Sequence, residues 1–207
     1  MTWTAPPLLT AAQVALEVPL RYARQGSSLA HAALAGARQF VELAHHPKAD
    51  VADRSAGTKF YYHAHRHGSG EHGHFHLFAE GPEGHGGHIH LAALSLSAQG
   101  QPLAWFTTNQ WVTAERWTPA ADVHARLATF RIATRGRMAP VARWLTAMVH
   151  LFQPQLHTLL LERDQTMARL QQQHPSLSPT SLREDRRFDI LSQTSAELAP
   201  RISGLTA

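Results

Sequence analysis

Histidines at alternating positions are the feature of this chain most able to do chemistry. Nine of its 16 histidines lie between residues 60 and 90, where the sequence reads FYYHAHRHGSGEHGHFHLFAEGPEGHGGHIH. Neutral imidazoles bind iron, copper, zinc and nickel, and several on one surface can hold a single ion. A β-strand points alternate side chains to the same face, so each run of three histidines should share a face. The two runs are His63, His65 and His67, and then His72, His74 and His76.

A hairpin between the two runs would decide which histidines oppose one another. Residues 68–71, Gly-Ser-Gly-Glu, have the composition of a two-residue turn. Opposed Cβ atoms lie about 4.5–5.5 Å apart, close enough for two imidazoles to reach one ion. The predicted opposed pairs are His67 with His72, His65 with His74, His63 with His76, and Tyr61 with Phe78. The other face is apolar and should pack on a core: Phe60, Tyr62, Ala64, Phe75, Leu77 and Ala79.

Histidines in this pattern can also form a solvated polar strand face or a low-complexity tract that binds metal loosely. Protonated imidazoles stacked in register would repel one another, because like charges directly opposite each other destabilise a sheet. A face needed only for solubility would more naturally carry Lys, Glu or Thr. The predicted register therefore favours a specific metal site.

The predicted ligands are the histidines whose place in the hairpin is best defined. Pairing is firmest in the middle of the hairpin, so the four central histidines should bind most tightly. One histidine beside the turn and one from the next strand complete the set: His63, His65, His74, His76, His72 and His90. Three further side chains are candidates for hydrogen bonding or proton transfer beside the ion: Glu71, Tyr61 and Asn109.

A second hairpin is expected after a Gly-rich connection. The connection is residues 80–87, the strands are residues 88–97 and 102–112, and the turn is at residues 99–100. This register places His90 opposite Asn109 and Leu94 opposite Trp105. In a simple meander, His90 and Asn109 extend the histidine surface, and Trp105 and Trp111 wall it to form a pocket.

Apolar positions recurring every three or four residues predict helices on both sides of these strands. Pro19 should shorten or kink the first helix, and Pro47 should end the second. The predicted helices cover residues 10–24, 28–46, 118–135 and 140–170, with a short helix within 181–199 and a loop at 48–58. The histidines of the N-terminal helices are interpreted as structural: His31, His45 and His46. His150 and His157 would join the metal site only if their helix covered it.

The fold class that follows is α+β, with an antiparallel sheet of about four strands, in two hairpins, flanked by N- and C-terminal helices. The sheet should occupy residues 59–112 of a single metal-binding domain at residues 1–175. Residues 176–207 should form a C-terminal tail with a short helix, and this tail is the expected contact in an oligomer.

Composition excludes several classes of protein. With 207 residues, 43% hydrophobic and 16% charged, the chain can build one core. It has no cysteine, which excludes disulfides, thiolate ligands and iron–sulfur clusters. The net charge of +4 comes mainly from scattered arginines, a pattern that argues against nucleic-acid binding. No signal peptide or membrane-length apolar stretch is evident, so a cytoplasmic location without membrane contact is expected.

Three motifs resemble an uncharacterised family of bacterial proteins of unknown function. They are YYHAH at residues 61–65, EHGHFHLF at residues 71–78 and FTTNQWV at residues 106–112. The resemblance implies that the histidine hairpin and the strand containing Asn109 belong together. It brings no activity, cofactor or catalytic residue with it.

Two functions of different classes fit this pattern. The first is a non-haem iron or copper metalloenzyme of the oxidoreductase class acting on a small molecule, with zinc or nickel as other ions that imidazoles accept. The second is a non-catalytic protein for storage, buffering or delivery of copper, zinc or nickel. A haem protein is disfavoured, because the chain lacks Cys-x-x-Cys-His and strands seldom supply both axial ligands. The expected tryptophan-walled pocket favours the enzyme, since a carrier needs no pocket.

Overall fold

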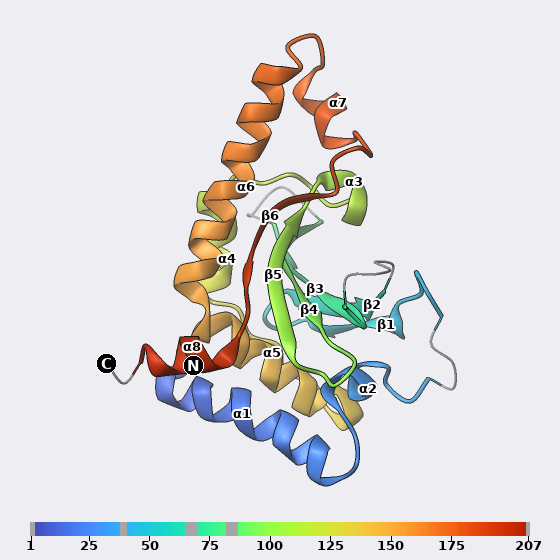
Figure 1. Ribbon diagram of the computed structural model, residues 1–207, viewed down its shortest axis with the longest axis vertical. Coiled ribbons are helices and arrows are strands. Elements are labelled where there is room, and N and C mark those ends of the chain that lie inside the picture. Colours follow the sequence, from blue (N-terminus) through green and yellow to red (C-terminus); the bar gives the residue numbers. More distant parts are fainter. Residues whose placement is uncertain (1–2, 38–40, 65–69, 82–86, 206–207) are drawn as a thin grey trace.

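The computed structural model describes residues 3–37, 41–64, 70–81 and 87–205. It confirms the α+β class, with one antiparallel sheet of six strands rather than four, in the order β1-β2-β3-β4-β5-β6 (Figure 1). The strands are β1 (His46–Asp53), β2 (Thr58–His63), β3 (Gly73–Glu80), β4 (His88–Leu96), β5 (Pro102–Thr108) and β6 (Ile190–Ser195). The helices are α1 (Leu8–Arg24), α2 (Leu29–Ala33), α3 (Gln110–Thr113), α4 (Ala120–Ala128), α5 (Ala139–Leu151), α6 (Gln153–Gln173), α7 (Pro179–Arg183) and α8 (Leu198–Ser203), with a 3-10 turn η1 (Gly136–Met138).

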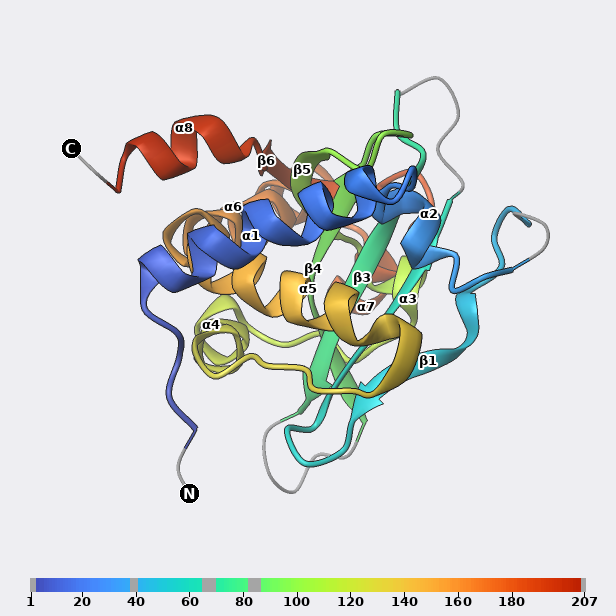
Figure 2. The same cartoon turned by 90° about the horizontal axis from the view of Figure 1, so that it is seen from below.

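Four helices, α1, α4, α5 and α6, gather on one side of the sheet (Figure 2). Helix α1 packs along α5, α4 packs along α6, and α6 contacts β5 and β6. Large apolar side chains fill the space between the two layers: Phe60, Tyr62, Phe75, Leu77 and Trp105 from the sheet, and Trp144, Met148, Phe152 and Leu159 from the helices. The predicted apolar face of the histidine hairpin is therefore confirmed, and the histidine face points away from these helices.

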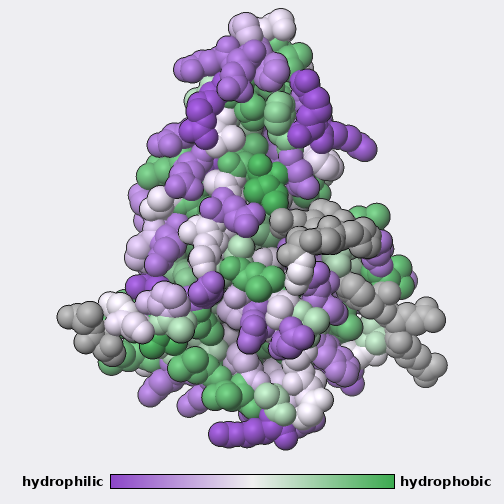
Figure 3. Space-filling view, viewed as in Figure 1, coloured by the Kyte–Doolittle hydropathy of each residue, from purple (hydrophilic) through white to green (hydrophobic). Residues whose placement is uncertain are grey.

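Helix α1 is not shortened at Pro19. Proline has no N–H, so the carbonyl of Ala15 one turn earlier would lack its usual main-chain donor. The Trp144 indole of α5 donates to that carbonyl over 3.2 Å and so replaces the missing bond. Helix α1 exposes four leucines to solvent: Leu8, Leu9, Leu16 and Leu20. In the space-filling view, hydrophobic residues reach the surface over this helix (Figure 3).

The predicted helix over residues 28–46 is wrong beyond its first residues. Helix α2 ends at Ala33, and Ala35 and Gly36 then adopt φ angles of 54° and 78°. This left-handed conformation ends helices, and a glycine adopts it without a steric penalty. The predicted loop at 48–58 is also wrong in part, because its first residues belong to β1, which pairs with β2 at the edge of the sheet.

The register of the histidine hairpin differs from the prediction by two residues. In the structure His63 lies opposite His74, and Tyr61 lies opposite His76. The described pairing ends at His63 and His74, and the predicted turn at residues 69–70 lies partly outside the described residues. A shift of two residues keeps every side chain on its predicted face, because the side-chain period of a strand is two.

A β-bulge in β4 brings His90 to the histidine face. Ala93 pairs with His76 and Ala92 pairs with Leu77, but the next pair is Phe78 with His90. One residue of β4 is therefore passed over, and the alternation of the strand changes phase at that point. As a result, Ala93 and His90 both lie on the same face as His76.

The second hairpin is only partly as predicted. Leu94 does lie opposite Trp105, but β5 ends at Thr108, so the predicted pair of His90 with Asn109 is wrong. Asn109 instead caps α3, accepting from the Gln110 N–H over 3.0 Å. The predicted tryptophan wall is also wrong. The Trp105 ring is buried on the helix side, 6.3 Å from the Phe152 ring, and the Trp111 indole donates to the Phe188 carbonyl over 2.8 Å.

The C-terminal segment completes the sheet. Strand β6 lies within the residues expected to form a tail, and it pairs with β5 along its length. The Ser192 hydroxyl donates to the Leu159 carbonyl of α6 over 2.7 Å, which ties the strand to the helix layer. The prediction of a helix within residues 181–199 is wrong in the middle of that range, where the chain forms β6 instead. The six residues of β6 include few large apolar side chains, so their sequence gives only a weak periodic signal.

Candidate metal centre

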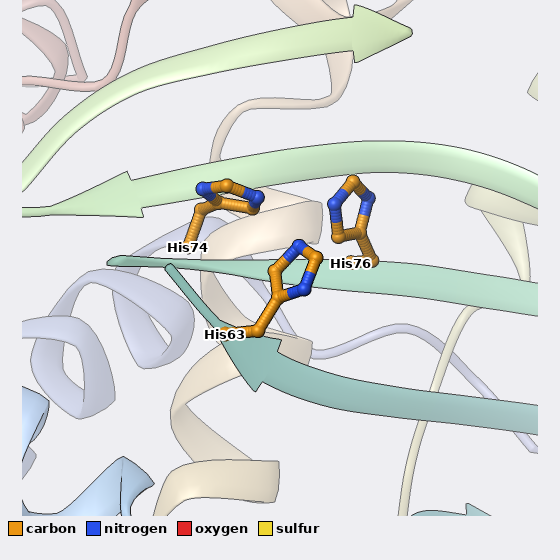
Figure 4. A group of neighbouring side chains, drawn as sticks. All are labelled: His63, His74 and His76. Atoms are coloured by element: carbon orange, nitrogen blue, oxygen red, sulfur yellow. The ribbon is translucent and has the colours of Figure 1, made fainter. Parts of the chain in front are cut away.

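Three histidines from two neighbouring strands point toward one another on the face away from the four helices (Figure 4). His63 ends β2, His74 lies opposite it in β3, and His76 follows two residues along β3. One ligand nitrogen of each lies within 4.8 Å of the others. We call these residues the histidine triad. In the described parts of the chain, it is the one group of three or more His, Asp or Glu side chains placed to share a metal ion.

The histidine triad is shielded from solvent. The exposed fraction is 8% for His63 and 0% for His74 and His76, and the Nε2 atom of each is buried. Ring centroids lie 4.6 Å apart for His63 and His74, 5.0 Å for His63 and His76, and 4.8 Å for His74 and His76. An imidazole nitrogen binds zinc at about 2.0–2.1 Å, so two nitrogens on one ion are at most about 4.2 Å apart. The three nitrogens, which lie within 4.8 Å of one another, would therefore have to come closer together to share a single ion.

Glu71 orients His74. A carboxylate oxygen of Glu71 lies 2.5 Å from Nδ1 of His74, and the Glu71 side chain is only 4% exposed. Because a carboxylate only accepts hydrogen bonds, Nδ1 of His74 carries the proton and Nε2 has the lone pair. A carboxylate behind a histidine is a common support for metal ligation, since it fixes the ring and raises the basicity of the ligand nitrogen.

His90 supports His76 in the same way. Its Nε2 lies 3.0 Å from Nδ1 of His76, and its own Nδ1 lies 3.5 Å from the Thr108 hydroxyl. Burial, followed by the positive charge of Arg163, lowers the pKa of His90 to about 3, so its ring is neutral and can accept a hydrogen bond. When Nδ1 of His76 donates to His90, Nε2 of His76 is the nitrogen available to an ion. His90 thus lies behind the histidine triad rather than within it.

Tyr61 forms one wall of the site. Its ring is 5.2 Å from the rings of both His63 and His76. The His45 ring is stacked on that of Tyr61 at 3.7 Å, with an interplanar angle of 9°. Burial, followed by the negative charges of Asp50 and Glu115, raises the pKa of Tyr61, so its hydroxyl stays protonated.

The other predicted site residues that the structure describes do not join the histidine triad. The His72 ring bonds to the Tyr62 hydroxyl over 2.8 Å instead of joining the triad. Asn109, predicted beside the ion, donates to the Leu182 carbonyl over 2.9 Å and so holds α7. His65 lies outside the described residues. The Nε2 atom of His150 is 2.6 Å from the Phe130 carbonyl, and the His157 ring lies 4.2 Å from that of His124, so neither is near the triad.

A cavity of about 430 Å³ adjoins the site behind Tyr61 and Phe78. Phe78 connects the two, because its ring lies 5.3 Å from that of His90. Titratable side chains from four segments line the cavity: His45, Asp50, Lys59, His88, Glu115 and Arg116. Burial raises the pKa of Glu115 to about 8, although the nearby Arg163 opposes this, so much of this carboxyl is protonated at neutral pH.

Three residues around the site are not predicted by the sequence pattern. The pattern favours a structural role for His45 and gives Thr108 and Glu115 no role. In the sequence, Thr108 is notable only because it precedes Asn109 in a strand that is predicted to extend beyond both residues. No local pattern marks His45 or Glu115, because each reaches the site from a segment whose conformation is predicted incorrectly or left unassigned.

The family model described as "Domain of unknown function (DUF6969)" matches residues 9–196. The chain belongs to this family. The match covers most of the chain and runs from α1 to the end of β6, so the last strand is part of the family domain. Membership agrees with the resemblance seen in the three motifs, and the family description assigns no function. Comparison with curated proteins and with solved structures returned no match. Among the helices in the described ranges, none combines the length and apolar character that crossing a membrane requires.

Proposed function

We propose that the histidine triad binds one transition-metal ion through the Nε2 atoms of His63, His74 and His76. The observation that carries the proposal is the pairing behind two of the ligands. Glu71 engages Nδ1 of His74, and His90 engages Nδ1 of His76, which leaves the buried Nε2 atoms to face a common centre. Histidines that hold metal ions typically have their second nitrogen engaged in this way.

The donor set favours a metal of intermediate softness. Three imidazoles without a sulfur ligand suit Fe(II), Cu(II), Zn(II) or Ni(II) and disfavour calcium and magnesium, which prefer oxygen ligands. We place iron or copper first. Three ligands on one face of an ion leave coordination positions that a substrate or water can occupy.

We further propose that the chain is a metalloenzyme of the oxidoreductase class acting on a small molecule. The cavity behind Tyr61 and Phe78 supports this, because it has room for a small substrate and shares the Tyr61 ring with the histidine triad. Glu115 lines that cavity, and its raised pKa of about 8 suits a group that accepts or donates a proton near neutral pH. When bound, the metal would supply the electron transfer or Lewis acidity that no side chain of this chain supplies.

A metal carrier is the second candidate function. The observation that favours it is the density of imidazoles around the triad, since His45 and His90 both lie within ring contact of triad members. A carrier fills the coordination sphere with protein ligands, whereas an enzyme leaves a position open. Azide added to the copper- or iron-loaded protein distinguishes them. A new charge-transfer band indicates an open position, and an unchanged spectrum indicates a closed site.

Elemental analysis of protein purified without a histidine tag tests the metal site itself. We expect one ion per chain in the unmodified protein and less than a tenth of that in His74→Ala. The matched control is His72→Ala, which removes an imidazole two residues away that contacts Tyr62 instead of the triad. His174→Ala is a second control on the far end of α6. Equal metal content in His74→Ala and in both controls would refute the histidine triad as the binding site.

A further inference from the structure

A second cavity lies away from the histidine triad and is lined by arginines. Its volume is about 660 Å³, and it lies between α1, the segment at residues 131–134 and the start of α5. Asp53, at its edge, pairs with Thr58 at the end of β2 remote from His63. Five residues of strand span about 17 Å, so the two sites are separate.

Three arginines from three different segments line this cavity: Arg21 in α1, Arg131 after α4, and Arg143 in α5. The Arg131 guanidinium lies 5.9 Å from the Trp3 ring and donates to the Ser55 hydroxyl over a long 3.5 Å. Within the described residues, no acidic side chain forms an ion pair with any of the three arginines. Their charges therefore accumulate in one concave surface.

The one acidic residue lining the cavity is already engaged elsewhere. Asp53 accepts four hydrogen bonds, from the N–H and hydroxyl of Ser55 and from the N–H groups of Ala56 and Ala133. Although burial acts in the opposite direction, the bonds from Ser55 and Ala133 hold the pKa of Asp53 below its usual range. Its carboxylate organises the cavity wall and does not neutralise the arginines.

The remaining lining suits an organic ligand. Helix α5 begins at the cavity with Ala139 and Pro140, so the positive end of its dipole adds to the arginine charges. Trp3 and Ile132 supply apolar surface. The volume falls within the range of about 300–1,000 Å³ typical of small-molecule pockets and exceeds what an inorganic anion needs.

We propose that this cavity binds a small organic dianion, a phosphate ester or a dicarboxylate, through Arg21, Arg131 and Arg143. A guanidinium forms paired hydrogen bonds with phosphate or carboxylate oxygens, and both groups meet that geometry. Convergence from three segments gives the site its selectivity for two or more negative charges. The apolar wall around Trp3 accommodates the carbon skeleton.

Calorimetric titration of the full chain at low ionic strength tests the proposal. The probes are ribose 5-phosphate, succinate, inorganic phosphate and uncharged ribose. We expect ribose 5-phosphate or succinate to bind more tightly than inorganic phosphate, and ribose not to bind. The stronger of the two dianions identifies the anionic group that the site recognises.

Arginine variants locate the binding. Arg21→Gln and Arg143→Gln should each weaken binding about tenfold, the loss expected for one charge-assisted contact at an exposed position. The matched control is Arg24→Gln, which removes the same charge one turn along α1 from an exposed arginine that does not line the cavity. All three variants should keep the melting temperature of the parent, since these side chains are exposed.

Three results would overturn the proposal. The first is no binding of either dianion at about 10 mM, which corresponds to a negligible affinity. The second is that neither dianion binds more tightly than inorganic phosphate. The third is equal weakening of binding in Arg24→Gln and Arg143→Gln.

Discussion

Replacing Glu71 tests how the site is built, because this residue touches a ligand and not the ion. Glu71→Gln keeps an oxygen that accepts from Nδ1 of His74, so the tautomer of that ring is retained, but the negative charge is lost. Removing such a partner lowers metal affinity about 10- to 100-fold. A charge-assisted hydrogen bond is roughly twice as strong as a neutral one. We therefore expect about a tenfold loss in Glu71→Gln, or about 1.4 kcal/mol, and a loss nearer 100-fold in Glu71→Ala.

The structure places the loss in Glu71→Ala at the upper end of this range. The Glu71 side chain is 4% exposed, and its oxygen lies 2.5 Å from the His74 ring, so solvent screens the contact little. Competition with a chelator of known affinity measures the loss for each variant. Glu80→Gln is the control, since it removes an exposed carboxylate at the other end of β3. Affinity within a factor of two of the parent in Glu71→Gln and Glu71→Ala would refute the role given to this carboxylate.

Three further predictions concern stability. Metal ligation requires neutral imidazoles, so a chelator should lower the melting temperature at pH 7.5 and have little effect at pH 5.5, below the unperturbed histidine value of about 6.5; equal melting temperatures in all four conditions would contradict a metal site. Glu115 has a folded pKa of about 8, above its unfolded value of 4.5, so the folded state holds its proton more tightly and stability falls as pH rises between these values. Urea unfolding should accordingly show a larger stabilisation in Glu115→Gln at pH 8.5 than at pH 5, and a pH-independent difference would contradict the raised pKa. Trp144→Phe removes the donor to the Ala15 carbonyl and should destabilise the chain by about 1–3 kcal/mol. Pro19→Ala should offset part of that loss by restoring the main-chain donor, and additive effects of the two changes in thermal melts would argue against the coupling.

The faces of the central strands could be predicted from the sequence, but their register could not. Alternation at a period of two separates Tyr62 and Phe75 from His63 and His74 whatever the turn, because every even shift preserves it. The register depends on the length of the connection, and a Gly-Ser-Gly-Glu segment is compatible with more than one length. Two of the four predicted central ligands, His63 and His76, are predicted to lie opposite each other and instead lie diagonally, yet both remain in the triad.

The surroundings of the site depend on contacts that no local pattern encodes. His45 reaches Tyr61 because β1 replaces the end of a predicted helix, and that replacement follows from left-handed backbone at Ala35 and Gly36. Strand β6 illustrates the same limit. Its six residues carry little periodic signal, and their place in the sheet comes from pairing with β5 and from the bond between Ser192 and α6.

The bulge in β4 shows how a metal centre can depend on backbone irregularity. In a regular strand, residues an even number apart share a face, so Ala93 opposite His76 would place Leu91 on the histidine face and His90 among the helices. A buried imidazole on that side would have to find a partner among apolar side chains, at a cost of about 1–3 kcal/mol if it failed. Because the bulge passes over one residue of β4, Nε2 of His90 lies 3.0 Å from Nδ1 of His76, and Leu91 is fully buried in the core. The bulge therefore keeps the core apolar and also supplies the hydrogen bond that turns Nε2 of His76 toward the other triad histidines.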